Sequence, residues 1–272
     1  MGLVKMHNGV AALDEANEEV CIYCDQCVAV CPPGAMSLHV PDDAAQLAEL
    51  DSYGIIPLEL TAADLKPLES VGSLPKPEQF EALVATRRTV RAYQDTPVDH
   101  ATIEHLVHDV LVNAPTGHNV RGLKAVVVEG RDKIEHLTDL SMDGFARLAE
   151  DQSWHSFDRK VFARLVTAWR EQHIDRIFRT AHQAIFTYCK TSIPPRDPAI
   201  LLNLAYFQLA AWTRGIGTAW AGYFMIIAND PAIKAYLGVA DDESIHGAVM
   251  FGYPQWDFPR LPQRPDIGLS YR

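Results

Sequence analysis

The chain of 272 residues lacks the features that would place it in a membrane or on a secretory route. Its longest near-continuous apolar run, 219–228, is about half as long as the roughly 20 residues of a membrane-spanning helix. Its first ten residues contain neither the apolar core nor the cleavage site of a signal peptide. Hydrophobic residues make up 48% and charged residues 22%, which excludes wholesale disorder. We therefore expect a folded, cytoplasmic protein without a membrane partner.

The chain also lacks an excess of positive charge, because its formal net charge is -11. Residues 1–80 contain 13 acidic and 3 basic residues, whereas the remainder is close to neutral. A nucleic acid needs a basic binding face, so this charge distribution argues against a nucleic-acid partner. Two interpretations of the acidic segment stay open: a solvated small domain, and a docking surface for a basic partner.

Cysteine is scarce outside one short segment, in which Cys21, Cys24, Cys27 and Cys31 lie within eleven residues and a proline follows. Disulfides between such close neighbours would close tiny loops. Structural zinc sites usually separate two Cys-x2-Cys pairs by a longer loop. The spacing C-x2-C-x2-C-x3-C-P is that of iron–sulfur ligands in bacterial ferredoxins. We predict that the four cysteines bind a 4Fe-4S cluster, with a zinc-bound interaction module as the alternative.

A second cysteine run is missing. In two-cluster ferredoxins the fourth cysteine of each run ligates the other cluster, so Cys31 would serve a second cluster whose other ligands this sequence lacks. One hypothesis is that the chain begins just inside a two-cluster module, and the other is that Cys31 turns back to the same cluster. Cys189 is a poor ligand candidate, because the apolar stretch 184–189 predicts a buried position in a helix.

Prolines and glycines between residues 54 and 77 divide the chain into two parts. We predict an iron–sulfur module with its linker at 1–75 and a second domain at 76–272. A few strands among many helices predict an α+β fold, in which the almost wholly apolar helix 198–212 is central and buried. Periodicity and capping residues predict helices at 42–50, 78–85, 99–112, 131–150, 157–190, 198–212 and 231–237, and strands at 123–128, 217–220 and 248–251.

Four polar segments of the second domain are suited to a planar cofactor that carries a phosphate. Segments 86–91 and 259–264 supply arginines, whose fixed donor forks match phosphate. Segment 113–121 is a polar loop able to meet the hydrogen-bonding edge of a heterocycle. Segment 214–223 has glycines that permit close backbone approach, beside a tryptophan. Each signal is weak alone.

Together, and behind a ferredoxin-type cysteine run, these segments resemble the nitroreductase family of FMN enzymes, in particular its fusions with an N-terminal ferredoxin module. The resemblance implies that the first and last segments bind the FMN phosphate and ring edge. It also implies that the asparagine of the loop faces the isoalloxazine and that the tryptophan strand covers the ring near N5. The implied FMN-binding residues are Arg87, Arg88, Thr89, Arg91, Pro115, Thr116, Gly117, Asn119, Arg121, Trp220, Ala221, Gly222, Arg260 and, more weakly, Arg264.

Arg121 departs from the family loop, which often has glutamine at this position. The extra positive charge would stabilise an anionic reduced flavin or attract an anionic substrate. A phosphate contact or an ordinary surface arginine are the alternatives.

The resemblance further implies an antiparallel-rich sheet flanked by helices and a homodimer with FMN at its interface. No side chain is expected to be catalytic, because the flavin N5 carries the chemistry. Electrons would come from the cluster, from NAD(P)H or from a ferredoxin-like protein, and pass through FMN to a small acceptor such as a nitroaromatic or a quinone. The alternative function is an electron-transfer protein that relays electrons to a protein partner.

Overall fold

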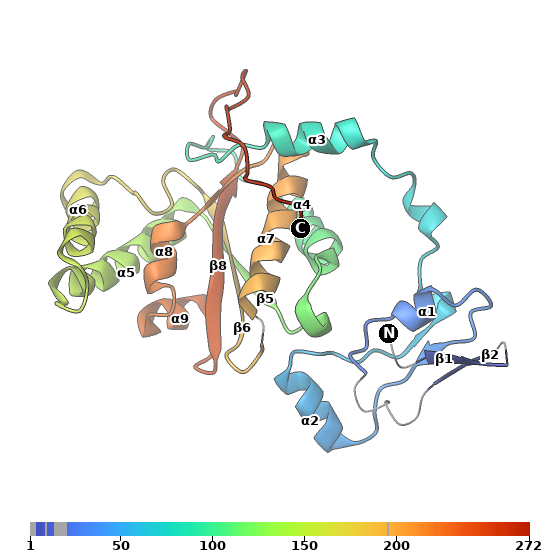
Figure 1. Cartoon of the computed structure of the whole chain (residues 1–272). Helices are drawn as coiled ribbons and strands as arrows, with labels where there is room; N and C mark the ends of the chain where they lie inside the picture. Colours follow the sequence, from blue (N-terminus) through green and yellow to red (C-terminus); the bar gives the residue numbers. More distant parts are fainter. Residues whose placement is uncertain (1–3, 9, 14–20, 195) are drawn as a thin grey trace.

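The computed structural model describes residues 4–8, 10–13, 21–194 and 196–272 (Figure 1). Its largest sheet has four antiparallel strands in the order β5-β6-β8-β7. Helices cover both faces of this sheet, which confirms the predicted α+β fold. The strands are β5 (Lys124–Glu129), β6 (Gln183–Lys190), β7 (Gly217–Trp220) and β8 (Glu243–Gly252).

Two apolar cores fill the space between the sheet and its helices. The first core is rich in aromatic rings, with Phe178, Phe186 and Phe224 fully buried and in mutual contact. The second core includes Phe207 and Phe251, whose ring centroids lie 5.5 Å apart. Burial of each such ring contributes about 1.5–3 kcal/mol. The first core packs α5 (Arg131–Glu150), α6 (Ser156–Gln172), α8 (Gly222–Ile227) and α9 (Pro231–Leu237) on the sheet, and the second packs α4 (His100–His105) and α7 (Arg196–Trp212).

The prediction of a helix across 157–190 is wrong in its second half. The helix α6 ends at Gln172, and residues 183–190 form β6, the strand between β5 and β8. A central strand covered on both faces shows a continuous apolar run, which periodicity alone does not distinguish from a buried helix. Cys189 is buried as predicted, but in a strand.

Predicted helices with clear capping residues are confirmed. Asp99 caps α4 by accepting a hydrogen bond from the Thr102 N–H at 2.9 Å. Beyond α4 the chain widens into a π-helix over 106–110 and then tightens into a 3-10 turn over 111–113. Such π-helical turns occur frequently near functional sites.

The prediction that helix 198–212 is buried on all sides is wrong for the single chain. Leu204 and Phe207 are fully buried against the sheet. Leu201, Leu202 and Tyr206 lie on the same helix and are 49%, 44% and 40% exposed. The helix is therefore apolar on an outer face that this chain does not cover.

The N-terminal part contains small elements that extend beside the main domain (Figure 1). They are β1 (Val4–His7), β2 (Val10–Leu13), α1 (Gln26–Ala29), β3 (Ser37–Leu38), α2 (Ala44–Ser52) and β4 (Leu60–Thr61). Helix α2 ends in a left-handed turn at Gly54, with the Ile55 N–H bonded to the Leu50 carbonyl oxygen. A connector with 3-10 turns over 62–64 and 68–71 leads to α3 (Pro77–Thr86). No helix in the described ranges is long and apolar enough to cross a membrane.

Candidate functional site

The arginine-rich segment after α3 lies along strand β7. Thr89 pairs with Thr218 in a parallel bridge, and the Val90 N–H donates to the Thr218 carbonyl oxygen at 3.0 Å. Val90 is buried and occupies the space that a side chain at Gly217 would need. The structure thus brings the first and third predicted segments together, and the glycine permits their close approach.

An open surface lies where β7 passes into α8. Ala221 is buried, and its N–H donates to the Ala248 carbonyl oxygen at 3.0 Å, which fixes the strand end on β8. Trp220 is 36% exposed beside it. A Cβ atom placed on Gly222 would meet no atom within 4 Å. The turn therefore leaves room for a flat group to lie directly against the backbone.

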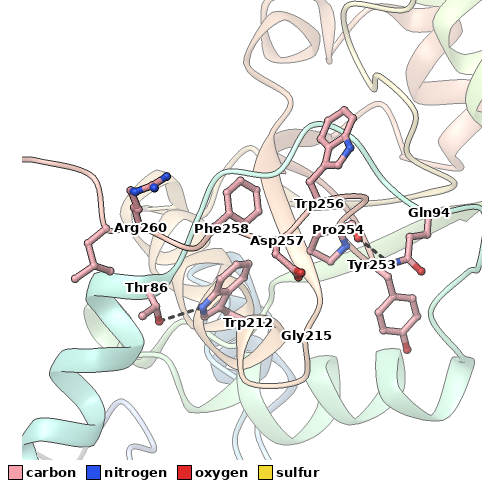
Figure 2. Close-up of a pocket in the computed structure, with 11 residues that line it drawn as sticks. Thr86, Gln94, Trp212, Gly215, Tyr253, Pro254, Trp256, Asp257, Phe258 and Arg260 are labelled. Carbon is pink, nitrogen blue, oxygen red and sulfur yellow. Dashed lines mark hydrogen bonds between the residues drawn. The ribbon is translucent and has the colours of Figure 1, made fainter.

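A hollow of about 380 Å³ lies at the end of α3, with Arg260 on its wall (Figure 2). The Trp212 indole N–H donates to the Thr86 hydroxyl at 3.2 Å, which joins the C-terminal end of α7 to α3. Thr86 and Arg260 line the same hollow, so the fourth predicted segment reaches the residue that precedes Arg87. Arg264 is exposed and is not among the lining residues.

The Arg88 side chain has a buried N–H donor that forms no hydrogen bond within the described part of the chain. Its guanidinium lies 5.5 Å from the centre of the Phe258 ring, in a cation–π contact. Its Nε atom is buried and has no hydrogen-bond partner there. Buried donors are usually satisfied, so this donor is available to a group bound beside Arg88.

A group of arginines gathers near the start of α8. Arg91, Arg176 and Arg179 are close enough for their charges to interact, and Tyr223 lies within the same electrostatic range of Arg179. Burial, with repulsion from Arg91 and Arg176, lowers the pKa of the Arg179 guanidinium. Within the ranges that the structure describes, none of these three arginines forms an ion pair. The group is therefore a concentration of positive charge, which the Asp175 carboxylate offsets only in part at Arg179.

A tight turn presents Arg179 to this group. The buried Asp175 carboxylate accepts hydrogen bonds from the Ile177 and Phe178 N–H groups at 2.7 and 2.9 Å. Burial nevertheless raises the pKa of Asp175. Arg179 itself has a φ of 62°, which is unusual for a residue with a side chain. On the far side of the turn, Thr180 accepts a hydrogen bond from the Tyr93 N–H at 2.9 Å.

The start of loop 113–121 is held on α7, away from the contact at Thr86. Its start is held where the Asn203 side chain donates to the Leu111 carbonyl oxygen at 2.5 Å. Asn203 precedes Trp212 by nine residues on α7, so about 13 Å of helix separates this contact from the one at Thr86. The start of the second predicted segment is therefore separated from the hollow at Thr86 and Arg260 in one copy of the chain.

Asn119 contacts the cysteine segment. Its side-chain amide donates to the Ile22 and Tyr23 carbonyl oxygens at 3.0 and 2.7 Å. Its Oδ1 atom accepts from Arg121 Nε at 3.0 Å, and Arg121 also donates to the Val112 carbonyl oxygen at 2.7 Å. The flavin contact expected for Asn119 and the charge role expected for Arg121 stay predictions.

Four cysteines lie in a short segment around α1. Cys21, Cys24, Cys27 and Cys31 are all half-buried. The Ala35 N–H donates to Cys31 Sγ at 3.3 Å, a contact typical of thiolates that bind iron–sulfur clusters. In the described residues, no three histidine, cysteine or acidic side chains are grouped closely enough to hold a metal ion. The four thiols are donors of the kind that binds an iron–sulfur cluster.

Sequence reasoning missed Arg176 and Arg179. The only signal was a pair of basic residues that flank an apolar pair in Arg-Ile-Phe-Arg, which is common on ordinary surfaces. Their importance depends on the turn at Asp175, which sequence periodicity does not reveal.

Both parts of the chain match known protein families. The sequence model of the nitroreductase family matches residues 84–253. The model of the 4Fe-4S binding domain matches residues 15–37, a range that includes all four clustered cysteines. A 4-nitrobenzoate reductase of Nocardioides sp. (strain LMS-CY) is 25% identical over 214 residues, which cover 69% of this chain and 85% of that protein.

Solved structures share the fold of the second part. A nitroreductase with bound FMN from Bacteroides fragilis NCTC 9343 superposes with a TM-score of 0.56 at 19% identity and covers 71% of this chain and 96% of that one. A nitroreductase with bound FMN from Desulfitobacterium hafniense DCB-2 gives a TM-score of 0.54 at 20% identity, with 72% and 100% coverage. At these identities the likeness establishes the fold.

Proposed function

Because the chain belongs to the nitroreductase family and is thus an FMN-dependent oxidoreductase, we propose that it reduces a nitroaromatic acceptor with electrons that enter at a 4Fe-4S cluster. The observation that carries this proposal is the direct contact between the cysteine segment and the predicted flavin loop through Asn119. NAD(P)H is the competing donor and a quinone the competing acceptor. The proposed parts are an iron–sulfur module with linker at 1–75 and a flavin domain at 76–272.

We propose that the four clustered cysteines hold the cluster and that the arginine segments hold FMN. Gly222 faces open space, and Arg88 Nε is a buried donor in need of a partner, so the residues present fit a flat, anionic cofactor. Arg87 and Arg260 would bind the phosphate, with Thr89 adding a hydroxyl, and Arg91 would meet the ring edge. When bound, FMN supplies an electron carrier able to receive electrons singly and deliver them in pairs.

The chain's own residues would orient the reaction and control its charge. The Ala221 backbone, fixed on β8, and the Trp220 indole would shape the surface on which the ring lies. Arg91 and Arg179 would stabilise negative charge that develops at this surface. No side chain is assigned a proton transfer, because solvent reaches the exposed Trp220 edge.

A second copy of the chain would complete each site, and we propose a homodimer. The apolar outer face of α7, with Leu201, Leu202 and Tyr206, supports this arrangement because such faces mark protein interfaces. The separation of the start of loop 113–121 from the hollow at Thr86 and Arg260 within one copy supports it further. In a dimer, that loop would approach the flavin of the partner.

We propose that the acceptor carries a carboxylate beside its nitro group. The name of the Nocardioides relative is consistent with such a compound, and the positive charge of Arg91, Arg176 and Arg179, which Asp175 offsets only in part, would attract it. Arg179→Gln is expected to raise the KM for 4-nitrobenzoate about 10- to 100-fold, the equivalent of one charge-assisted hydrogen bond. The KM for neutral nitrobenzene should change far less.

The matched control is Arg170→Gln, which removes an exposed arginine that pairs with Asp143 at 2.6 Å on the α5–α6 side. It should leave both KM values unchanged. Equal losses with charged and neutral acceptors in Arg179→Gln would mean that the residue supports the flavin or the fold and does not select the acceptor.

The proposed function is tested on the full chain purified without oxygen. Iron, zinc, acid-labile sulfide and FMN are measured per chain, and turnover of 4-nitrobenzoate is then followed with reduced methyl viologen or NAD(P)H. We expect about four iron and four sulfide atoms with one FMN, and faster turnover with the viologen. Zinc in place of iron, or no FMN, would overturn the proposal. Turnover with redox dyes but with no nitro compound or quinone would favour the electron-relay function.

A further inference from the structure

The contact between the two parts of the chain is centred on three residues at the end of the loop, Asn119, Arg121 and Gly122. Besides the Asn119 side chain, the Arg121 and Gly122 N–H groups both donate to the Gly54 carbonyl oxygen, at 2.6 and 2.9 Å. Gly54 is buried and left-handed, with a φ of 69°. A Cβ atom there would lie 2.8 Å from Ile193 Cδ1, so only glycine allows this approach. The docking contact therefore depends on residues of both segments, Gly54 in the N-terminal part and the backbone at 121–122.

Two further contacts lie in the same interface between the N-terminal part and the rest of the chain. Lys190 forms an ion pair with Asp51, and the Ser192 hydroxyl donates to the Ser52 carbonyl oxygen at 3.3 Å. Both acceptors lie at the end of α2, next to Gly54. The interface thus holds the N-terminal part at two points, the cysteine segment and the end of α2. The contact made by Asn119 reaches the residues between two of the cysteines.

The two carbonyl groups that accept from Asn119 lie between two of the proposed cluster ligands. Ile22 and Tyr23 are the two residues between Cys21 and Cys24, so Asn119 bonds the backbone between two proposed cluster ligands. Tyr23 is left-handed, with a φ of 50°, and its carbonyl makes the shorter of the two bonds at 2.7 Å. The amide of one side chain then spans the distance from the ligand loop to the predicted flavin loop.

The Asn119 side chain is fully engaged in this contact. Its nitrogen meets two acceptors, and its oxygen accepts from Arg121, whose own position is fixed by the Val112 carbonyl oxygen. Asn119 also has a φ of 55°, a conformation that asparagine tolerates better than most residues. An amide that is satisfied on both ends is oriented by the protein.

We propose that Asn119, held by Arg121, is a positioning residue that docks the Cys21–Cys24 loop on the flavin loop and thereby sets the rate of electron transfer from the cluster to FMN. This inference rests on the proposed function. Each reduced viologen gives up one electron and is oxidised. Two such electrons pass through the cluster, one at a time, and with two protons from water they reduce one FMN.

The test uses Asn119→Asp and Asn119→Gly, which both tolerate a left-handed backbone and both remove the amide donors. Asn113→Asp is the matched control, because Asn113 lies in the same loop but bonds only the Asp109 carbonyl oxygen at 2.7 Å among the described residues. Each protein is prepared with its measured iron and FMN content and mixed without oxygen with a limiting amount of reduced methyl viologen. Viologen oxidation reports electron entry, and bleaching of the flavin band reports arrival.

We expect both Asn119 variants to oxidise viologen at the wild-type rate and to bleach their flavin at least about tenfold more slowly, as for other losses of outer-shell contacts to metal ligands. Hydrogen exchange at residues 21–31 should rise in both variants and not in the control. Arg121→Gln should show a smaller change in the same direction. These readouts do not depend on acceptor turnover.

Two results would overturn the inference, and they differ. Flavin bleaching and hydrogen exchange at wild-type levels in both Asn119 variants would remove the role of Asn119 and leave the proposed function standing. A wild-type protein that contains cluster and FMN but never bleaches its flavin after viologen oxidation would remove the proposed electron route, and the inference with it.

Discussion

We expect the Cys27→Ser variant to lose its iron–sulfur cluster and, with it, turnover driven by a one-electron donor. Cys27 lies on the short helix α1, beside Val28, which is 2% exposed and anchors the helix. A thiolate binds iron far better than a hydroxyl does, and a site with three remaining thiolates holds the cluster weakly. Changes in outer-shell contacts alone cost about 10- to 100-fold, so the loss of a ligand should exceed about 100-fold in viologen-driven turnover. Iron and sulfide analysis with anaerobic kinetics checks this.

Cys189→Ala is the matched control for the cysteine prediction. Cys189 is fully buried in β6, whereas the other four cysteines are half-buried in the segment around α1. Its replacement should leave iron, sulfide and FMN unchanged. Cys27→Ser should also keep its FMN, because the arginine segments are intact. Unchanged iron in Cys27→Ser, or zinc in the wild type, would contradict the cluster assignment.

Sequence signals that report local structure predicted the second domain well. The helix at 231–237 agrees with α9 residue for residue, because Asp230 caps it and a left-handed glycine at 238 ends it. The strand at 217–220 agrees with β7 in the same way. Signals that depend on tertiary contacts were less informative. The apolar run 183–190 becomes a strand because β5 and β8 pair with it on either side, a fact that no local pattern contains.

At the candidate site, too, features with local signals were predicted well and tertiary contacts were not. The arginine segment 86–91 and the glycine-containing segment 214–223 were predicted from residue types that suit a phosphate and a flat ring, and the structure places Thr89 and Val90 of the first beside Thr218 of the second. The contact of Asn119 with the cysteine segment was not predicted, because it joins residues 96 and 97 positions apart. The role of Arg179 depends on a turn built on a buried carboxylate, which sequence composition does not distinguish from a surface loop.

The double variant Arg87→Ala with Arg260→Ala is expected to be purified without FMN. Arg87 ends α3 directly after Thr86, and Thr86 and Arg260 line one hollow, so the two basic segments converge from distant parts of the sequence. A hydrogen bond to a charged group contributes about 1.5–3 kcal/mol, so the two arginines together contribute about 3–6 kcal/mol to phosphate binding. The Kd for FMN should then rise about 10²- to 10⁴-fold. Fluorescence titration of the apoprotein with FMN measures it.

The effect should be specific to the phosphate. Riboflavin lacks that group, so its weaker binding should be the same in the wild type and in the double variant. Arg170→Ala, on the far side of the domain, is the control for a general loss of positive charge. Full retention of FMN in the double variant would refute the phosphate assignment. Equal losses of FMN and riboflavin affinity would mean that Arg87 and Arg260 maintain the shape of the hollow, since only a loss confined to FMN reports contact with its phosphate.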